Sequence, residues 1–279
     1  MKNSALKSSV LLATLLIAGT VWTGTVSAAV TKGGDYTTSA NLVLQAGTGP
    51  VSPLDPTEPD NPVTPLVPGT PGAGGNITVD YGSTLYFGTQ TISTQAQTYY
   101  AHPDLVTDKD SNLKAVPNHA QVTDQSGELA GWTLTLTQAS DLHLSTGTAS
   151  DPGYALTGAS ISFTGGQIIG GNGMTDGTPT DVATTGTLTP GVATKLVAAS
   201  SGKGAGTWLY SFGAIGAYDA ASVDTTNPAD QTKVASKSAI SLAIPAGLVQ
   251  KAEAYSTSLY WSLQAVPDNT WTGETTATS

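Results

Sequence analysis

The chain has 279 residues, with 20 acidic side chains against 10 basic ones, and its formal net charge of −10 argues against the basic surface that nucleic acids require. All ten basic residues are lysines, and cysteine is absent, which excludes disulfides, thiolate metal sites and a cysteine nucleophile. Only 11% of residues are charged, and 32 glycines and 16 prolines interrupt any long element, which is not the composition of a helical cytosolic protein.

Residues 1–28 have the pattern of a secretory signal peptide. Lys2 and Lys7 precede an apolar run at 10–21, and small residues follow up to Ala28. A membrane anchor is the alternative, but about 12 apolar residues are fewer than the roughly 20 that cross a bilayer. We expect an exported chain over 29–279, with a net charge of −12, no membrane span and no apolar sorting tail.

A proline-rich segment follows near the start of this exported chain. Prolines recur at every third position from Pro50 to Pro71. A polyproline II helix has three residues per turn, so this spacing predicts a rod at 50–75 that interrupts the domain and stays outside its core. A disordered proline-rich linker is the alternative.

Short runs of alternating apolar and polar residues predict strands along the rest of the chain. They lie at 42–44, 77–81, 85–87, 97–101, 120–124, 132–138, 156–163, 195–199, 207–212, 240–244 and 258–265. No stretch has a capped helical stripe. The pattern favours an all-β fold, an antiparallel β-sandwich or barrel-like domain of many short strands, with long loops such as 165–180.

The sequence contains no convincing catalytic motif. There is no G-x-S-x-G elbow, and three histidines in unrelated contexts are expected at the surface or at strand ends: His102, His119 and His143. Glycine clusters at 170–173 and 202–206 lack the strand-to-helix context of a phosphate loop and are expected to be turns. The acid pairs Asp104 with Asp108 and Asp124 with Glu128 could serve a glycosidase only if they face a cleft. We therefore expect no enzyme and no cofactor.

One segment resembles a calcium loop. Asp108 to Asn112 carries carboxylate and amide oxygens at suitable spacing. However, Leu113 replaces the glycine that the sharp turn needs, and His119 replaces the bidentate glutamate. The segment is expected to be a solvated turn, and no metal site is predicted.

Two tryptophan-containing strands are the most informative feature. Trp132 and Leu134 are two residues apart on one strand, as are Trp261 and Leu263 on another. These W-x-L triplets resemble the two motifs of the WxL-domain surface proteins of Gram-positive bacteria. The resemblance extends to residues 83–93, 98–101, 122–132 and 265–267.

The resemblance implies a secreted, non-catalytic protein that attaches non-covalently to cell-wall peptidoglycan and has other surface proteins of the same gene cluster as partners. A surface adhesin or complex subunit that binds a host molecule or partner protein is the alternative. The family often places an arginine two residues after Asp124, where this chain has Ser126, so the geometry of that loop is in question.

The residues leave two roles open for the motifs. Trp132, Leu134, Trp261 and Leu263 are the candidate binding residues, but a tryptophan alternating with threonine or serine is also what a buried strand face requires. If the indoles are core residues, the glycan must meet polar strand faces, loops, or other aromatic residues such as Trp208 or Trp271.

Overall fold

The computed structural model describes residues 36–69, 75–225, 227 and 232–265, which belong to two units divided between Val43 and Leu44. In the first unit, residues 36–43 form no strand or helix and all their side chains are exposed, so the strand predicted at 42–44 is not present. The predicted signal peptide, its cleavage site and Trp271 lie outside the described residues.

The second unit consists of short antiparallel strands, which confirms the all-β class. In chain order these are β1 (Leu54–Asp55), β2 (Glu58–Pro62), β3 (Thr64–Pro65), β4 (Ile77–Gly82), β5 (Gln97–Tyr100), β6 (Asp104–Thr107), β7 (Leu113–Val116), β8 (His119–Asp124), β9 (Trp132–Gln138), β10 (His143–Leu144), β11 (Ser160–Thr164), β12 (Gln167–Gly170), β13 (Asp181–Val182), β14 (Thr185–Thr187), β15 (Ala193–Ala199), β16 (Gly206–Ser211), β17 (Ile240–Ile244), β18 (Tyr255–Ser256) and β19 (Leu259–Gln264). The one helical element in the described chain is a 3-10 turn at Ala220–Ser222.

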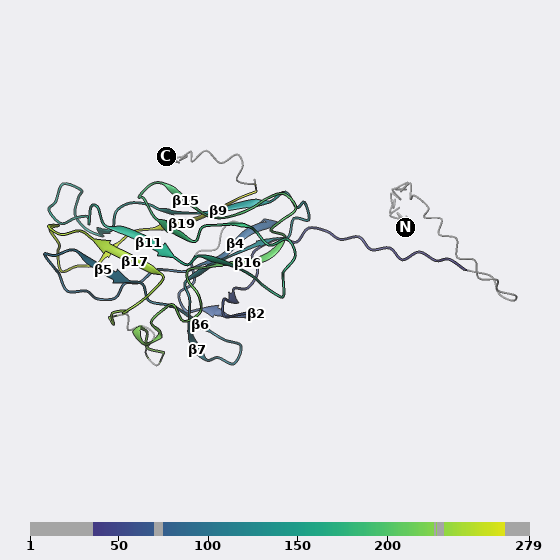
Figure 1. The fold of residues 1–279 in the computed structure, drawn as a ribbon, viewed down its shortest axis with the longest axis horizontal. Coiled ribbons are helices and arrows are strands. Elements are labelled where there is room, and N and C mark those ends of the chain that lie inside the picture. Colours follow the sequence, from purple (N-terminus) through teal and green to yellow (C-terminus); the bar gives the residue numbers. More distant parts are fainter. Residues whose placement is uncertain (1–35, 70–74, 226, 228–231, 266–279) are drawn as a thin grey trace, which may run out of the picture. The chain divides into compact units, whose positions relative to one another are not determined.

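These strands form several small sheets. Three have four strands, in the orders β14-β11-β17-β5, β12-β16-β8-β4 and β13-β15-β9-β19, and a fourth has the order β3-β6-β7. Two further pairs are β1-β2 and β10-β18. The four larger sheets are arranged like the blades of a four-bladed propeller (Figure 1). The structure does not show the sandwich or barrel that the alternation suggested.

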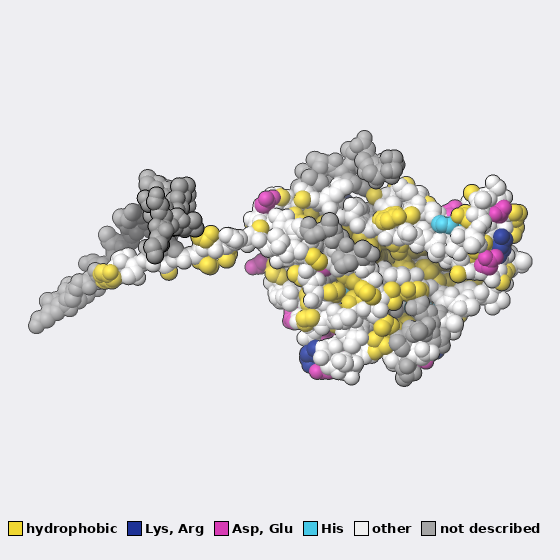
Figure 2. Space-filling view, turned by 180° about the vertical axis from the view of Figure 1, so that it is seen from behind, with side chains coloured by type: hydrophobic (Ala, Val, Ile, Leu, Met, Phe, Trp, Pro, Cys, Tyr) yellow, Lys and Arg dark blue, Asp and Glu magenta, His cyan; other side chains and the backbone are white. Residues whose placement is uncertain are grey.

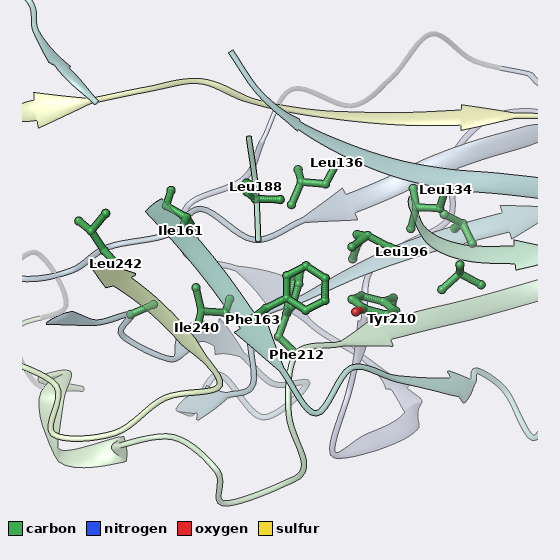
Figure 3. Packing of buried hydrophobic residues seen from close by; sticks show 14 of the residues in the cluster. Leu134, Leu136, Ile161, Phe163, Leu188, Leu196, Tyr210, Phe212, Ile240 and Leu242 are labelled. Atoms are coloured by element: carbon green, nitrogen blue, oxygen red, sulfur yellow. The ribbon is translucent and has the colours of Figure 1, made fainter. Parts of the chain in front are cut away.

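The main core lies where the four-stranded sheets face one another (Figure 3). Leu134 and Leu136 project into it from β9. Phe163, Tyr210 and Phe212 meet edge to face, with ring centroids 5.0 to 6.4 Å apart. Edge-to-face rings add to the stabilisation that burial alone supplies, so this cluster fixes how the sheets pack.

The proline-rich segment belongs to the folded domain, and the prediction that it stays outside the core is wrong. Its strands β1 to β3 pair within the domain, and β3 joins the sheet of β6 and β7. Leu54 is 3% exposed, and Val63 forms a second apolar cluster with Val106 and Val116. Prolines lack an N–H group but keep a carbonyl, so edge strands can contain them.

A buried polar network ties this segment to the sheet. The pairing of β4 with β8 skips Asp80, and this bulge accompanies a carboxylate that bonds to neighbouring segments. Asp80 accepts hydrogen bonds from the Val51 N–H (3.2 Å), the Gln121 amide (3.0 Å) and the Thr123 hydroxyl (2.6 Å). Gln121 in turn accepts the Leu54 N–H at 2.7 Å. Losing any member would leave buried polar atoms without partners.

An ion pair adds a second attachment. Asp55 in β1 is 1% exposed and pairs with Lys114 of β7. Burial opposes ionisation of Asp55, but hydrogen bonds from Lys114 and from the Thr57 hydroxyl and N–H outweigh it, so the pKa of Asp55 is lowered. The carboxylate therefore stays charged at neutral pH and holds β1 against the β6–β7 hairpin.

Two predictions about loops also need correction. The segment 165–180 is not one long loop, because β12 lies within it and pairs with β16. Conversely, residues 85–87 form no strand, although Leu85 and Phe87 pack against the core. The alternation at 85–87 reflects side chains that face the core without forming a strand, whereas 167–170 lacks the alternation that would have revealed β12.

Candidate functional site

The first W-x-L triplet lies in the core. Trp132 is fully buried and Leu134 is 1% exposed, both on β9 in the interior of its sheet. The Trp132 indole N–H donates to the Gly204 carbonyl at 2.9 Å. Gly204 has a φ of +81°, and a Cβ there would collide with the indole. The glycine cluster at 202–206 starts in the turn after β15, as predicted, but its last residue, Gly206, begins β16; Gly204 between them holds the indole in place.

The second triplet lies on an edge strand. β19 pairs with β9 on one side, and the described residues provide no strand on its other side. Trp261 and Leu263 are only partly buried, and they cover the core from outside. Trp261 lies opposite Leu136, four residues along β9 from Trp132, so the two indoles are attached about 14 Å apart along the strand direction. The two motifs therefore lie in different environments.

The position of Trp261 depends on a glycine. Its indole packs directly over Gly82 at the end of β4, where any Cβ would overlap the ring. Its ring centroid also lies 6.2 Å from that of Phe212. Gly82 is therefore the residue that lets the edge of one sheet approach the edge of the next, and sequence reasoning did not single it out.

A groove runs beside these two edges and has a volume of about 1960 Å³. β4 and β19 contribute one part of its lining, and the segments 83–92 and 250–258 contribute another. Buried aliphatic core residues form its floor, and its aromatic lining residues are Tyr81, Tyr86, Phe87, Tyr99, Tyr255, Tyr260 and Trp261. Of the candidate binding residues, only Trp261 and Leu263 line the groove.

Several lining segments are held by hydrogen bonds. The Tyr255 hydroxyl donates to the Gly153 carbonyl at 2.6 Å and accepts the Lys251 N–H at 2.9 Å. The Gln250 amide donates to the Ser93 carbonyl at 3.1 Å, which connects the 250–258 segment to the loop after residue 92. Tyr260, in contrast, is 61% exposed. The groove thus combines fixed segments with an accessible aromatic ring.

The groove contains few charges. Asp80, Lys251 and Glu253 are its charged lining residues, and Asp80 is buried in the network described above. Figure 2 shows the domain from behind relative to Figure 1. Hydrophobic side chains gather in the middle of this face, and charged side chains lie towards its margins. The lining of the groove therefore offers mainly apolar contact and hydrogen bonds.

A buried polar cluster supports β4 from behind. The Tyr81 and Ser83 hydroxyls donate to Asp104 at 2.5 and 2.7 Å, and Ser83 accepts the His119 N–H at 2.8 Å. Burial, and then the charge of Asp104, raises the pKa of Tyr81. Burial lowers the pKa of His119, which keeps the ring neutral at pH 7. The histidines were expected at the surface or at strand ends: His119 is the first residue of β8 but is fully buried, and His102, in the connection between β5 and β6, is 3% exposed.

The other sequence candidates have structural roles. Asp108 accepts the N–H groups of Asp110 and Asn112, which forms the turn between β6 and β7. Neither acid pair lines the groove. In the part of the chain that the structure describes, no cluster of three or more acidic, histidine or cysteine side chains could hold a metal.

The loop that lacks the family's arginine is closed by a local turn. Ser126 donates both its N–H and its hydroxyl to one oxygen of Asp124, at 2.9 and 2.6 Å. The other oxygen is buried and has no hydrogen-bond partner among the described residues. Trp208, the other aromatic candidate of the described chain, is 1% exposed and cannot meet a glycan.

Comparison with known proteins identifies the family. The model of the WxL domain, described as surface cell wall-binding, matches residues 31–267. No curated protein and no solved structure matches the chain. No helix within the described ranges is sufficiently long and apolar to cross a membrane. The match spans most of the sequence, and it indicates non-covalent binding to the cell wall at the cell surface. The chain therefore belongs to the WxL family of surface cell-wall-binding domains.

Proposed function

We propose that the chain is an exported, non-catalytic protein that holds peptidoglycan in the groove beside Trp261. The observation that carries this proposal is the size of the groove. Its volume of about 1960 Å³ exceeds the roughly 300–1000 Å³ of small-molecule pockets, so an extended polymer fits it better than a metabolite. Tyr260 and Trp261 offer partly exposed aromatic faces on which sugar rings can pack.

The charge of the groove favours the glycan over anionic wall polymers. Lys251 is its one basic lining residue among those described, and Glu253 offsets it. The exported chain carries eight lysines against twenty acids, so anionic polymers are repelled at long range. Neutral sugar rings meet no such penalty. Binding through hydrogen bonds and aromatic contact is the chemistry that these residues support.

The test is sedimentation of purified protein, residues 29–279, with isolated Gram-positive sacculi. Trp261→Ala and Tyr260→Ala should reduce the bound fraction while the protein remains folded. Ile215→Ala is the matched control, because Ile215 is 64% exposed, similar to Tyr260, and does not line the groove. Equal binding by the Tyr260 and Ile215 variants, together with unchanged binding by folded Trp261→Ala, would place the contact elsewhere.

The salt dependence checks the chemistry of attachment. Raising ionic strength from 0.01 to 0.1 M shortens the Debye length from about 30 to about 10 Å, so repulsion from an anionic wall weakens. Binding should then stay constant or increase. Loss of binding on addition of a chelator alone would indicate bridging cations. If no protein sediments under any condition, direct wall binding is refuted and attachment through a partner protein remains.

A further inference from the structure

The floor of the groove consists of aliphatic side chains that offer no hydrogen-bonding atom. Its buried members are Leu142, Leu156, Ile161, Leu242 and Ile244. Ile161 and Leu242 are register partners on the neighbouring strands β11 and β17 (Figure 3). A sugar ring placed on these side chains would leave its hydroxyl groups without partners, which costs free energy. The glycan of the proposed function therefore accounts for the aromatic part of the groove but not for its floor.

The strands around the floor are poorly suited to a peptide. An extended peptide brings one N–H and one C=O group per residue, and each of these groups needs a partner. The strands β11 and β17 are already paired on both sides. The facing sides of β4 and β19 lie against each other, with the Trp261 ring packed over Gly82. A hydrocarbon chain has no hydrogen-bonding group, so it meets no such requirement on this floor.

We propose that the groove binds an amphiphile that has an uncharged sugar head and an unbranched hydrocarbon chain. The chain lies on the aliphatic floor, where the partly buried Leu85 and Leu259 add to the apolar lining. The sugar lies beside Tyr260 and Trp261, and only this placement rests on the proposed function. The groove volume of about 1960 Å³ is large enough for both parts of such a ligand.

The charges of the lining favour an uncharged head. Lys251 and Glu253 are opposite in sign and both lie in the segment 250–258, so the accessible lining has no net charge. Asp80 is buried and accepts hydrogen bonds from its own domain. An anionic head, such as a carboxylate or a phosphate, would also be repelled by an exported chain with eight lysines and twenty acids. A sugar head avoids this repulsion.

The test is calorimetric titration of purified protein, residues 29–279, with alkyl maltosides of different chain length below their micelle concentrations. Each buried methylene contributes about 0.8 kcal/mol, which is a factor of about four in the dissociation constant. Decyl maltoside should therefore bind about 15-fold more tightly than octyl maltoside, and maltose alone should bind more weakly than either. Burial of the chain should also make the heat-capacity change of binding negative.

Two comparisons locate the chain and identify the head. Ile92 lines the groove and is 48% exposed, so Ile92→Glu should keep the fold and weaken decyl maltoside binding by roughly tenfold or more. Ile215→Glu is the matched control, because Ile215 is exposed outside the groove and its replacement should leave binding unchanged. Decanoate, in which a carboxylate replaces the sugar, should bind more weakly than decyl maltoside.

Several results would overturn the proposal. Absence of saturable binding, or dissociation constants of octyl and decyl maltoside within about twofold of each other, would show that no chain is buried. Equal effects of Ile92→Glu and Ile215→Glu would refute the site, and decanoate binding as tight as that of decyl maltoside would refute the sugar head.

The outcome is separable from that of wall binding. Sacculi extracted free of lipid contain the glycan but no hydrocarbon chain, so their sedimentation with the protein tests the proposed function alone. Absence of sedimentation, together with maltoside binding that depends on chain length, would refute wall binding and leave the amphiphile site intact.

Discussion

Truncation of Trp132 tests whether the first W-x-L motif is part of the core, in contrast to the second motif, which lines the groove. Trp132 is fully buried and its indole N–H donates to the Gly204 carbonyl. Trp132→Ala removes the largest side-chain type from the core and leaves that carbonyl without its donor. Removal of a buried tryptophan costs about 3–5 kcal/mol, which is a large part of the 5–15 kcal/mol that typically stabilises a domain.

Thermal unfolding followed by circular dichroism is the appropriate assay. At about 2–4 °C per kcal/mol for a domain of this size, the melting temperature should fall by roughly 6–20 °C, or the protein should fail to fold. Tyr260→Ala serves as the control, because a 61% exposed side chain away from packed contacts should change stability by about 0.5 kcal/mol or less. A folded Trp132→Ala protein whose melting temperature lies within 2 °C of the parent, a shift of about the size expected for a surface change, would refute the assignment of Trp132 to the core.

Three further predictions follow from the packing around β4. Replacing residues 50–65 by a Gly/Ser loop should lower the melting temperature by at least 10 °C, on the order of a loss of several kcal/mol. The replacement removes the buried Leu54 and Val63 and the hydrogen bond from the Val51 N–H to Asp80. An unchanged melting temperature would support a rod outside the core instead. Burial lowers the pKa of His119 in the folded protein, so the free energy of unfolding should be highest above the ordinary histidine pKa of 6.5 and should fall as the pH drops below it. A midpoint of urea unfolding that is constant from about pH 7 to 5 would contradict this. Gly82→Ala should displace the Trp261 indole and weaken sacculus binding in a protein that still folds cooperatively, whereas full binding would show that the ring position is not needed.

The strands that sequence reasoning located best are those with clear alternation. The ranges 132–138 and 240–244 coincide with β9 and β17. Alternation of apolar and polar residues reflects the preference of the chain for an extended strand with one buried face, and this preference is the same whichever sheet the strand joins. It carries no information about neighbours, so the assignment of the strands to several small sheets could not be read from it.

The two W-x-L triplets illustrate the same limit. Their residues are nearly identical, yet Trp132 is buried and Trp261 is partly exposed. The difference arises because β9 has a partner strand on each side while β19 has one. Strand order depends on contacts between residues more than a hundred positions apart, and no triplet encodes it.

Proline spacing was the most misleading pattern. A period of three suits a free polyproline II helix, but prolines are also tolerated in short edge strands, which this segment forms. The residues that decide between them lie elsewhere in the chain. Asp80 and Gln121 bind the backbone of this segment, and Lys114 binds Asp55. Alternation places Asp80 on the polar face of the strand predicted at 77–81, so its burial could not be read from the sequence.

The unequal burial of the tryptophans gives the groove its own optical probe. Trp132 and Trp208 are sealed from solvent, so a ligand in the groove should leave their emission nearly constant. Trp261 lines the groove, and a sugar or peptide placed against its ring would exclude water and shift its emission to shorter wavelength. A Trp271→Phe background would remove the remaining tryptophan of the exported chain outside the described residues. Occupancy could then be titrated in solution without any label.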